Sequence, residues 1–242
     1  MRGTVYLIPS FLQDDEAAQK VMPAYLVDAV KQCHVFYVEN EKTARRFLKK
    51  IWKEMVIDDY QWHTIHKAEK EAMPAFLKDI KDGKNIGIIS EAGCPGVADP
   101  GQVLIEAAQN LDTVIRPIVG PSAILLALMA SGMNGQTFQF MGYLPIDAAD
   151  RKKCLRDMEE YSAKKKCTQL FIETPYRNNQ LIGDILATCK PETRLCIAAD
   201  ITAATESIHT KTIADWKKGK APDYHKRPAM FLLLADLRIK EK

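Results

Sequence analysis

Apolar and polar positions change their spacing regularly along the first half of the chain. Short runs rich in Ile, Val and aromatic residues predict four strands, at residues 5–8, 35–38, 86–90 and 113–118. Between them, apolar residues three or four positions apart predict helices at 23–31, 42–55, 74–81 and 102–110. Residues 58–73 are polar and irregular, so no element is predicted there before the helix that starts at Pro74. This alternation of strand and helix predicts a mostly parallel sheet covered by helices on both faces.

The second half of the chain repeats the alternation with different lengths. The pattern predicts strands at 137–142, 169–172, 193–199 and 230–235, and helices at 124–129, 151–166, 178–189 and 213–218. Residues 230–235 are apolar throughout, which predicts a central strand covered on both faces, whereas 205–212 is a polar stretch. We therefore expect an α/β fold with two α/β domains, residues 1–118 and 119–242.

The loop at residues 90–101 has the composition of a binding loop. It holds three glycines and two prolines in twelve residues, between a predicted strand and a predicted helix. Gly lets the backbone approach a ligand closely, and Pro restricts the turn to one shape. Open α/β sheets bind ligands at the carboxyl ends of their strands. The sequence therefore predicts that a cofactor binds on this loop.

Two further turns between a strand and a helix have similar chemistry. Residues 120–123, Gly-Pro-Ser-Ala, present backbone N–H groups and a hydroxyl, although Ser122 could simply be the N-cap of the next helix. Residues 173–177 offer a carboxylate, a hydroxyl and a cation at a strand end. There, Thr174 could equally cap a helix that has Pro175 in its first turn. Both interpretations stay open at each turn.

The helix predicted at 42–55 is strongly basic on one face, with only Glu54 nearby. Its cations are Lys42, Arg45, Arg46, Lys49, Lys50 and Lys53. Such a face either binds phosphates of a nucleic acid or is an ordinary solvated surface. The net charge of the whole chain, +3, is too small to favour nucleic acid by itself.

Composition narrows the class of protein. The six cysteines form no C-x-x-C pair, as is typical of reduced intracellular thiols. Residues 118–133, the longest apolar run, are interrupted by Gly, Pro and Ser and are too short to span a bilayer. We expect a cytoplasmic protein that does not bind membranes. His63 and His66 lack carboxylate or cysteine partners nearby, so no metal is predicted.

Several of these segments together resemble one known family. Ser90-Glu91-Ala92-Gly93-Cys94-Pro95, followed by Asp-Pro-Gly at 99–101, resembles the cofactor-loop motif of the tetrapyrrole methylases. Residues 39–42, 120–123, 140–145 and 173–177 match its other motifs in the same order. The form of the loop is most similar to the branch that methylates a cytidine ribose 2′-oxygen of ribosomal RNA. The resemblance implies S-adenosylmethionine bound in a cleft between two α/β domains, an RNA substrate and a homodimer.

The resemblance also implies which residues form the site. The implied cofactor contacts are Phe11, Leu12, Gly93, Cys94, Pro95, Val97, Ser122, Ala123, Glu173, Thr174, Ala199, Pro228 and Ala229. Three carboxylates on motif loops could accept the proton of a ribose hydroxyl, namely Glu39, Glu91 and Glu173. The implied substrate contacts are Lys42, Arg45, Arg46, Lys49 and Arg177.

The chain departs from the ribosomal RNA branch at two places. Residues 8–12 keep the proline of the first loop and lose its glycine, and Cys94 replaces a threonine. Two other functions therefore stay open: methylation of a small tetrapyrrole, and a non-catalytic module that keeps a cofactor pocket and binds RNA or protein.

Overall fold

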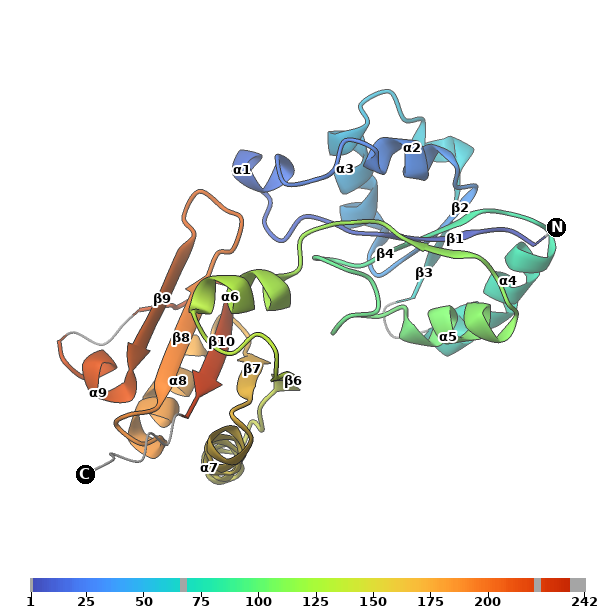
Figure 1. The fold of residues 1–242 in the computed structure, drawn as a ribbon. Coiled ribbons are helices and arrows are strands. Elements are labelled where there is room, and N and C mark those ends of the chain that lie inside the picture. The colour runs from blue at the N-terminus through green and yellow to red at the C-terminus, as the bar shows by residue number, and fades with distance from the viewer. Residues whose placement is uncertain (1, 66–68, 220–222, 236–242) are drawn as a thin grey trace. The chain divides into compact units, whose positions relative to one another are not determined.

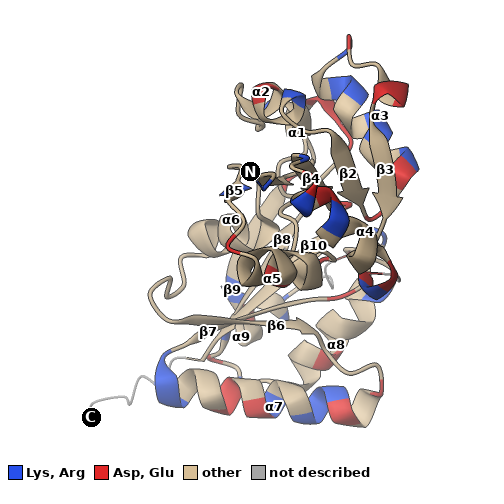
Figure 2. Cartoon of the chain, turned by 90° about the vertical axis from the view of Figure 1, so that its right-hand side faces the viewer, with Lys and Arg blue, Asp and Glu red and all other residues tan. Residues whose placement is uncertain are grey.

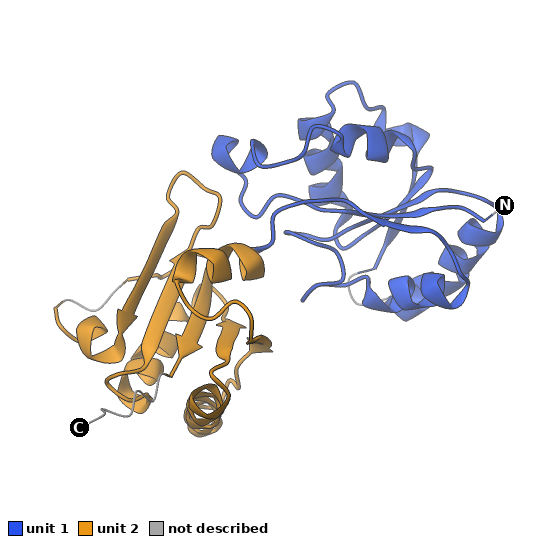
Figure 3. Ribbon diagram, in the orientation of Figure 1, with its two compact units in different colours: residues 1–122 blue, residues 123–242 orange. Residues whose placement is uncertain are grey.

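The computed structural model describes residues 2–65, 69–219 and 223–235. The chain forms two compact units, residues 1–122 and 123–242 (Figure 3). Each unit is built on one sheet of five strands in the described part of the chain (Figure 1). Helices accompany both sheets, so the predicted α/β class is confirmed. Within the described ranges, no helix is both long and apolar enough to cross a membrane.

The sheet of the first unit is entirely parallel. Its strands, in the order β3-β2-β4-β1-β5, are Gln61–Thr64, Val35–Val38, Ile86–Ile89, Val5–Ile8 and Ile115–Pro117. Four of the five are the predicted strands. The prediction that residues 58–73 are irregular is wrong, because β3 lies there. This strand is at the edge of the sheet with half-exposed side chains, so its sequence lacks the apolar run of a buried strand.

Helices cover both faces of this sheet, as predicted. On one face α2 (Leu26–Lys31) and α3 (Glu41–Ile51) contribute to an apolar cluster around Phe36 and Phe47. On the other face α4 (Glu69–Lys81) and α5 (Gln102–Asn110) contribute to a cluster around Tyr37 and Phe76. A short helix α1 (Glu16–Gln19) and a 3-10 turn (Ile57–Asp59) complete the unit.

Helix α4 begins five residues before the predicted start at Pro74. Proline is common in the first turn because its missing N–H costs nothing there. Here Pro74 lies beyond that turn, where the helix loses one backbone hydrogen bond. The helix continues past Pro74, and its residues Phe76 and Ile80 are fully buried.

The sheet of the second unit is mixed. Its strands, in the order β6-β7-β10-β8-β9, are Phe138–Tyr143, Thr168–Ile172, Ala229–Leu234, Arg194–Ala199 and Ser207–Thr212. Only β6 and β7 pair in parallel. Strand β10 lies at the centre, as its apolar sequence predicted. The polar segment at 205–212 holds β9, an edge strand that the sequence analysis missed because its outer side is exposed and polar.

The described part of the second unit contains four helices: α6 (Ala123–Ser131), α7 (Ala148–Lys165), α8 (Asn178–Thr188) and α9 (Ile213–Trp216). Leu155 of α7 and Ile185 of α8 are fully buried in one apolar cluster with Phe171 of β7 and Phe231 of β10. Helix α6 packs against β8, β9 and β10.

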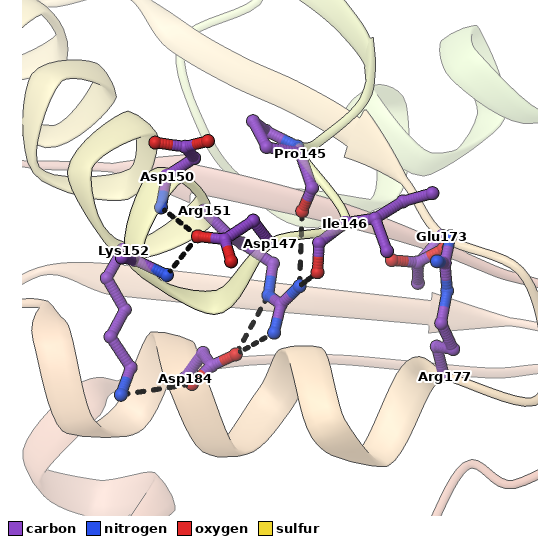
Figure 4. Close-up of polar contacts among 10 residues, drawn as sticks. Pro145, Ile146, Asp147, Asp150, Arg151, Lys152, Glu173, Arg177 and Asp184 are labelled. Atoms are coloured by element: carbon purple, nitrogen blue, oxygen red, sulfur yellow. Dashed lines mark hydrogen bonds and ion pairs between the residues drawn. The ribbon is translucent and has the colours of Figure 1, made fainter.

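A buried ion pair joins α7 to α8 (Figure 4). Arg151, whose side chain is 2% exposed, donates from Nε and Nη2 to Oδ2 of Asp184, at 2.8 and 2.6 Å. Its Nη1 donates to the carbonyl oxygens of Pro145 and Ile146, at 3.1 and 2.6 Å. The guanidinium therefore fixes the residues after β6 to both helices.

We expect Arg151→Met to lower the free energy of unfolding by about 3 kcal/mol, because it leaves the largely buried Asp184 carboxylate with the more distant Lys152 ammonium, 3.6 Å away, in place of the bonded guanidinium. Urea denaturation measures the change. The double variant Arg151→Met/Asp184→Leu should recover part of the loss. An Arg151→Met protein as stable as the wild type would show that the pair does not hold the two helices together.

Candidate cofactor and substrate site

The loops after β1 and β4 meet at the carboxyl ends of these adjacent strands. The Ser10 N–H donates to the Gly93 carbonyl at 2.9 Å, and the Gly93 N–H donates to the Ser10 carbonyl at 3.3 Å. The Ser10 hydroxyl donates to the Ser90 carbonyl at 2.9 Å. The chain after β1 leads to α2 on one face, and the chain after β4 leads to α5 on the other. The contact therefore lies at a topological switch point, where open α/β sheets bind ligands.

The turn after β5 joins the same place. The Cys94 thiol donates to the Pro121 carbonyl at 3.6 Å. A Cβ on Gly93 would lie 3.2 Å from Leu12 Cδ2 and 3.4 Å from the Pro121 carbonyl oxygen. Gly93 has φ +75°, which a side chain would also disfavour. Three loops that are distant in the sequence thus meet around Gly93, where the backbone carries no side chain.

The predicted residues of the first unit fall into this arrangement. Phe11 and Leu12 lie on the first loop, Gly93 to Val97 on the second, and Ser122 follows Pro121. Cys94 supplies a donor where the related branch has a threonine, and burial raises the pKa of its thiol, so the donor keeps its proton at neutral pH. Val97 is half exposed on the same loop.

Acidic side chains surround the start of the cofactor loop. The Glu39 carboxylate accepts from the backbone N–H of Glu91 at 3.0 Å. The Glu91 carboxylate accepts from the Thr43 hydroxyl on the first turn of α3. Burial and then the Glu39 charge raise the pKa of Asp99 from 3.8 to about 6; the Ser90 hydroxyl opposes this, and Glu91 adds a smaller increase. The sequence analysis missed Thr43 and Asp99, although Asp99 belongs to the Asp-Pro-Gly motif.

A pocket of about 200 Å³ lies beside this loop. It is lined by the first loop, by α3 and by the start of the cofactor loop: Ser10, Phe11, Leu12, Gln13, Asp14, Thr43, Arg46, Phe47, Lys50, Glu91 and Ala92. Two aromatic rings, two carboxylates and two cations thus share one cavity, in which Asp14 pairs with both cations. A sugar with a neighbouring phosphate has this mixed chemistry.

Several Lys and Arg residues of α3, which is marked by blue segments in Figure 2, are paired, so the basic face is more neutralised than its sequence suggests. Arg45 pairs with Glu41 at 2.5 Å, and its guanidinium lies 5.1 Å from the centre of the Trp62 ring. Lys50 and Arg46 both pair with Asp14. The Lys49 ammonium donates to the Lys53 and Met55 carbonyls at the end of the helix. Lys42 is exposed on the first turn of α3, next in sequence to Thr43, whose hydroxyl donates to Glu91.

The predicted residues of the second unit share one edge of its sheet. Ala229, at the start of β10, pairs with Ala199, at the end of β8. Met230 pairs with Ile172, at the end of β7, and Glu173 and Thr174 follow directly. The Asp200 N–H donates to the Pro228 carbonyl at 2.9 Å. Antiparallel pairing thus places the ends of two strands beside the start of a third.

Two ion pairs hold this edge. Oε1 of the buried Glu173 accepts from the Thr174 N–H at 2.6 Å and from the Arg177 guanidinium at 2.6 and 3.1 Å. Arg227 Nε donates to Asp200 at 2.7 Å. Glu173 is therefore occupied in holding its own turn, and the Asp200–Arg227 pair is a contact that the sequence did not predict.

Among the described residues, no three His, Cys, Asp or Glu side chains gather as metal ligands would. His63 stacks on Tyr37, with ring centres 4.7 Å apart, and lies 3.9 Å from Asp79. His66 lies outside the described residues.

The raised pKa of Asp99 predicts a pH-dependent stability difference. In the unfolded chain Asp99 ionises near its usual 3.8, and in the folded chain near 6. Because the folded state holds the proton more tightly, ionisation costs stability progressively as the pH rises from about 4 to about 6. Asp99→Asn removes this cost, so its Tm relative to the wild type should rise across that range and then level off.

Thermal unfolding of both proteins from pH 4 to pH 8 measures this difference. Asp58→Asn, at an exposed position in the 3-10 turn, is the matched control and should follow the wild type. Parallel Tm curves for Asp99→Asn and wild type would contradict the raised pKa.

Comparison with known proteins agrees with this architecture. The family model of the tetrapyrrole (corrin/porphyrin) methylases matches residues 21–216. The structure is similar to that of the methyltransferase CobJ, with TM-score 0.63, 16% identity, and coverage of 97% of this chain and 94% of the other. For the cobalt precorrin-4 methyltransferase CbiF the TM-score is 0.61 at 14% identity, with 96% and 94% covered.

The relatives in sequence are named for a different activity from that of CobJ and CbiF. A ribosomal RNA small subunit methyltransferase I of Buchnera aphidicola is 32% identical over 72% of this chain and 61% of its own length, which is less than two thirds. One of Streptococcus pyogenes is 28% identical over 88% of this chain and 70% of its own length. With most of its length matched by the family model and its fold shared with solved members, the chain belongs to the tetrapyrrole methylase family of S-adenosylmethionine-dependent methyltransferases.

Proposed function

We propose that this protein transfers a methyl group from S-adenosylmethionine to a ribose 2′-oxygen of small-subunit ribosomal RNA in the cytoplasm. The observation that carries the proposal is the bare backbone at Gly93, which lies where three loops meet beside a pocket flanked by Arg46 and Lys50. The names of the relatives support ribosomal RNA as the acceptor.

The residues around Gly93 suit the methyl donor, S-adenosylmethionine. A Cβ at Gly120 would lie 2.2 Å from Pro9, and one at Gly93 would approach Leu12, so both loops depend on missing side chains. We propose that these loops hold the donor together with Glu173, Thr174, Ala199, Pro228 and Ala229 of the second unit. When bound, S-adenosylmethionine supplies an electrophilic methyl group on a sulfonium. The task of the chain is then to place an oxygen in line with it, about 3 Å away.

The pocket beside α3 suits the acceptor ribose. Of the three candidate carboxylates, Glu91 lines this pocket and is exposed. Glu39 accepts from the Glu91 backbone, and Glu173 is held by Arg177. We propose that the 2′-oxygen bonds to the methyl carbon as the carbon–sulfur bond breaks, and that Glu91 accepts the hydroxyl proton. Glu39 and Thr43 then position Glu91.

Phosphates of the RNA would be held by the exposed cations. Arg46 and Lys50 of α3 line the pocket, and Lys42 is exposed on the first turn of the same helix. Arg46 would exchange its distant partner Asp14, at 3.9 Å, for a phosphate. Arg45 and Lys49 are engaged by Trp62 and by carbonyls, so we expect them to contribute less. Each phosphate contact adds about one unit to the slope of log affinity against log salt.

A transfer assay tests the proposal. The full chain is incubated with methyl-labelled donor and either small-subunit ribosomal RNA lacking this methylation or a porphyrinogen. Label in RNA, in a fragment resistant to alkali at one linkage, supports ribose 2′-O-methylation. Label in the porphyrinogen would instead show that the methyl acceptor is a tetrapyrrole. Donor binding by calorimetry without transfer to either would favour a non-catalytic module.

Glu91→Gln should lower kcat about 10²-fold or more, because the variant cannot accept the proton. The Kd for the donor should stay within about twofold, since the Gly93 loop keeps its backbone. Glu54→Gln, at an exposed position just after α3, is the matched control. A Glu91→Gln enzyme with wild-type kcat would exclude Glu91 as the proton acceptor.

We further propose that the protein acts as a homodimer, as the family resemblance implies. Strand β6 is an edge strand with exposed apolar side chains, among them Phe138, Met141 and Tyr143. Such an edge can pair with or pack against a second chain. Sedimentation equilibrium of the wild type should give twice the chain mass of 27.2 kDa. For Tyr143→Lys the measured mass should be closer to that of one chain.

A further inference from the structure

An exposed aromatic ring lies on the turn that carries the Glu173–Arg177 pair. Tyr176 is 70% exposed, although its neighbours Glu173 and Asn178 are buried. A tyrosine that only filled space would bury its ring, whereas this one holds most of its surface in water. Its position in the turn between β7 and α8 is the same sheet edge that carries the predicted donor contacts Thr174 and Ala199.

The backbone under this ring is held from several directions. The Arg177 N–H donates to the Thr174 carbonyl at 2.9 Å, and the Lys226 N–H donates to the Pro175 carbonyl at 3.0 Å. The buried Asn178 amide donates to the Arg227 and Tyr224 carbonyls, at 2.7 and 3.2 Å. The turn at 173–177 is thus tied to residues 224–227. A ring on a fixed turn loses little entropy when a ligand stacks on it.

Basic groups accompany the ring. The Lys226 ammonium lies 5.9 Å from the ring centre of Tyr176. The His225 ring lies 6.0 Å away at 75°, an edge-to-face arrangement. The Arg177 guanidinium, on the next residue, is 29% exposed at its side chain. The ring is therefore bordered by the Lys226 ammonium and the His225 ring, while the neighbouring Arg177 guanidinium is paired with Glu173.

We propose that Tyr176 stacks on an unpaired nucleobase of the RNA substrate, with Lys226 beside the adjoining phosphate. The proposal rests on the proposed function, which supplies RNA as the substrate. Aromatic rings bordered by cations bind single-stranded nucleic acid, because every base offers a π face and every linkage a negative charge. Stacking at this edge would hold one nucleotide of the bound RNA. Tyr176 is thus a positioning residue.

The test measures binding of the full chain to a fluorescent single-stranded oligoribonucleotide of about twelve nucleotides, with fixed salt. Tyr176→Ala should weaken binding about 5- to 50-fold, and Tyr176→Phe, which keeps the ring, should bind within about twofold of wild type. Tyr161→Ala removes an exposed ring on α7, which is 46% exposed, and should leave binding unchanged. In a separate titration at several salt concentrations, Lys226→Ala should reduce the magnitude of the slope of log affinity against log salt by about 0.7.

A second measurement separates stacking from a structural role. Oligonucleotides with one base removed at successive positions should bind wild type more weakly at one position, while Tyr176→Ala should not distinguish that position. Equal losses in both proteins, or wild-type binding by Tyr176→Ala, would overturn the inference. In that case methylation of ribosomal RNA by the wild type would still support the proposed function, whereas a wild type that neither binds nor methylates RNA would overturn both.

Discussion

The candidate site depends on a backbone contact between two loops that are eighty residues apart in the sequence. Ser10 and Gly93 exchange hydrogen bonds where the chain leaves β1 toward one face of the sheet and β4 toward the other. Gly93 takes a left-handed conformation with Leu12 and the Pro121 carbonyl close to where a Cβ would be. A larger residue would separate the loops. The Cys94–Pro121 contact and the Glu39–Glu91 contact both start from the loop that this pairing holds in place.

Charge in the first unit is balanced locally, and this changes how its basic helix is understood. Asp14 and Glu41 neutralise three of the cations on α3, and Trp62 covers Arg45. Glu39 and Glu91 lie at the start of the cofactor loop. Burial, then the Glu39 charge and less strongly the Glu91 charge, raise the pKa of Asp99. Cations next to carboxylates at one pocket can hold a phosphate and accept a proton within the same cavity. An evenly basic face could bind a polyanion, but it would offer no carboxylate to accept the proton.

The second unit uses ion pairs differently. Arg151 and Asp184 are buried between helices and fix the architecture, whereas Glu173–Arg177 and Asp200–Arg227 hold the turns at the sheet edge. Because Glu173 is engaged in this way, it positions its turn and presents Tyr176 to solvent. The turn whose motif pointed to cofactor binding thus combines predicted donor contacts with an exposed ring.

Local sequence determined the buried strands, the helices between them and the Gly- and Pro-rich turns, because each depends on residues near one another in the chain. The all-apolar β10 is central for that reason. Tertiary structure alone decided β3 and β9, since edge strands are formed by hydrogen bonds from a neighbouring strand rather than by their own apolar pattern. It also decided that Arg45 lies against Trp62, that Glu91 lines a pocket while Glu173 is paired with Arg177, and that burial raises the pKa of Asp99. These properties are set by distances between residues far apart in the sequence, which no local pattern contains.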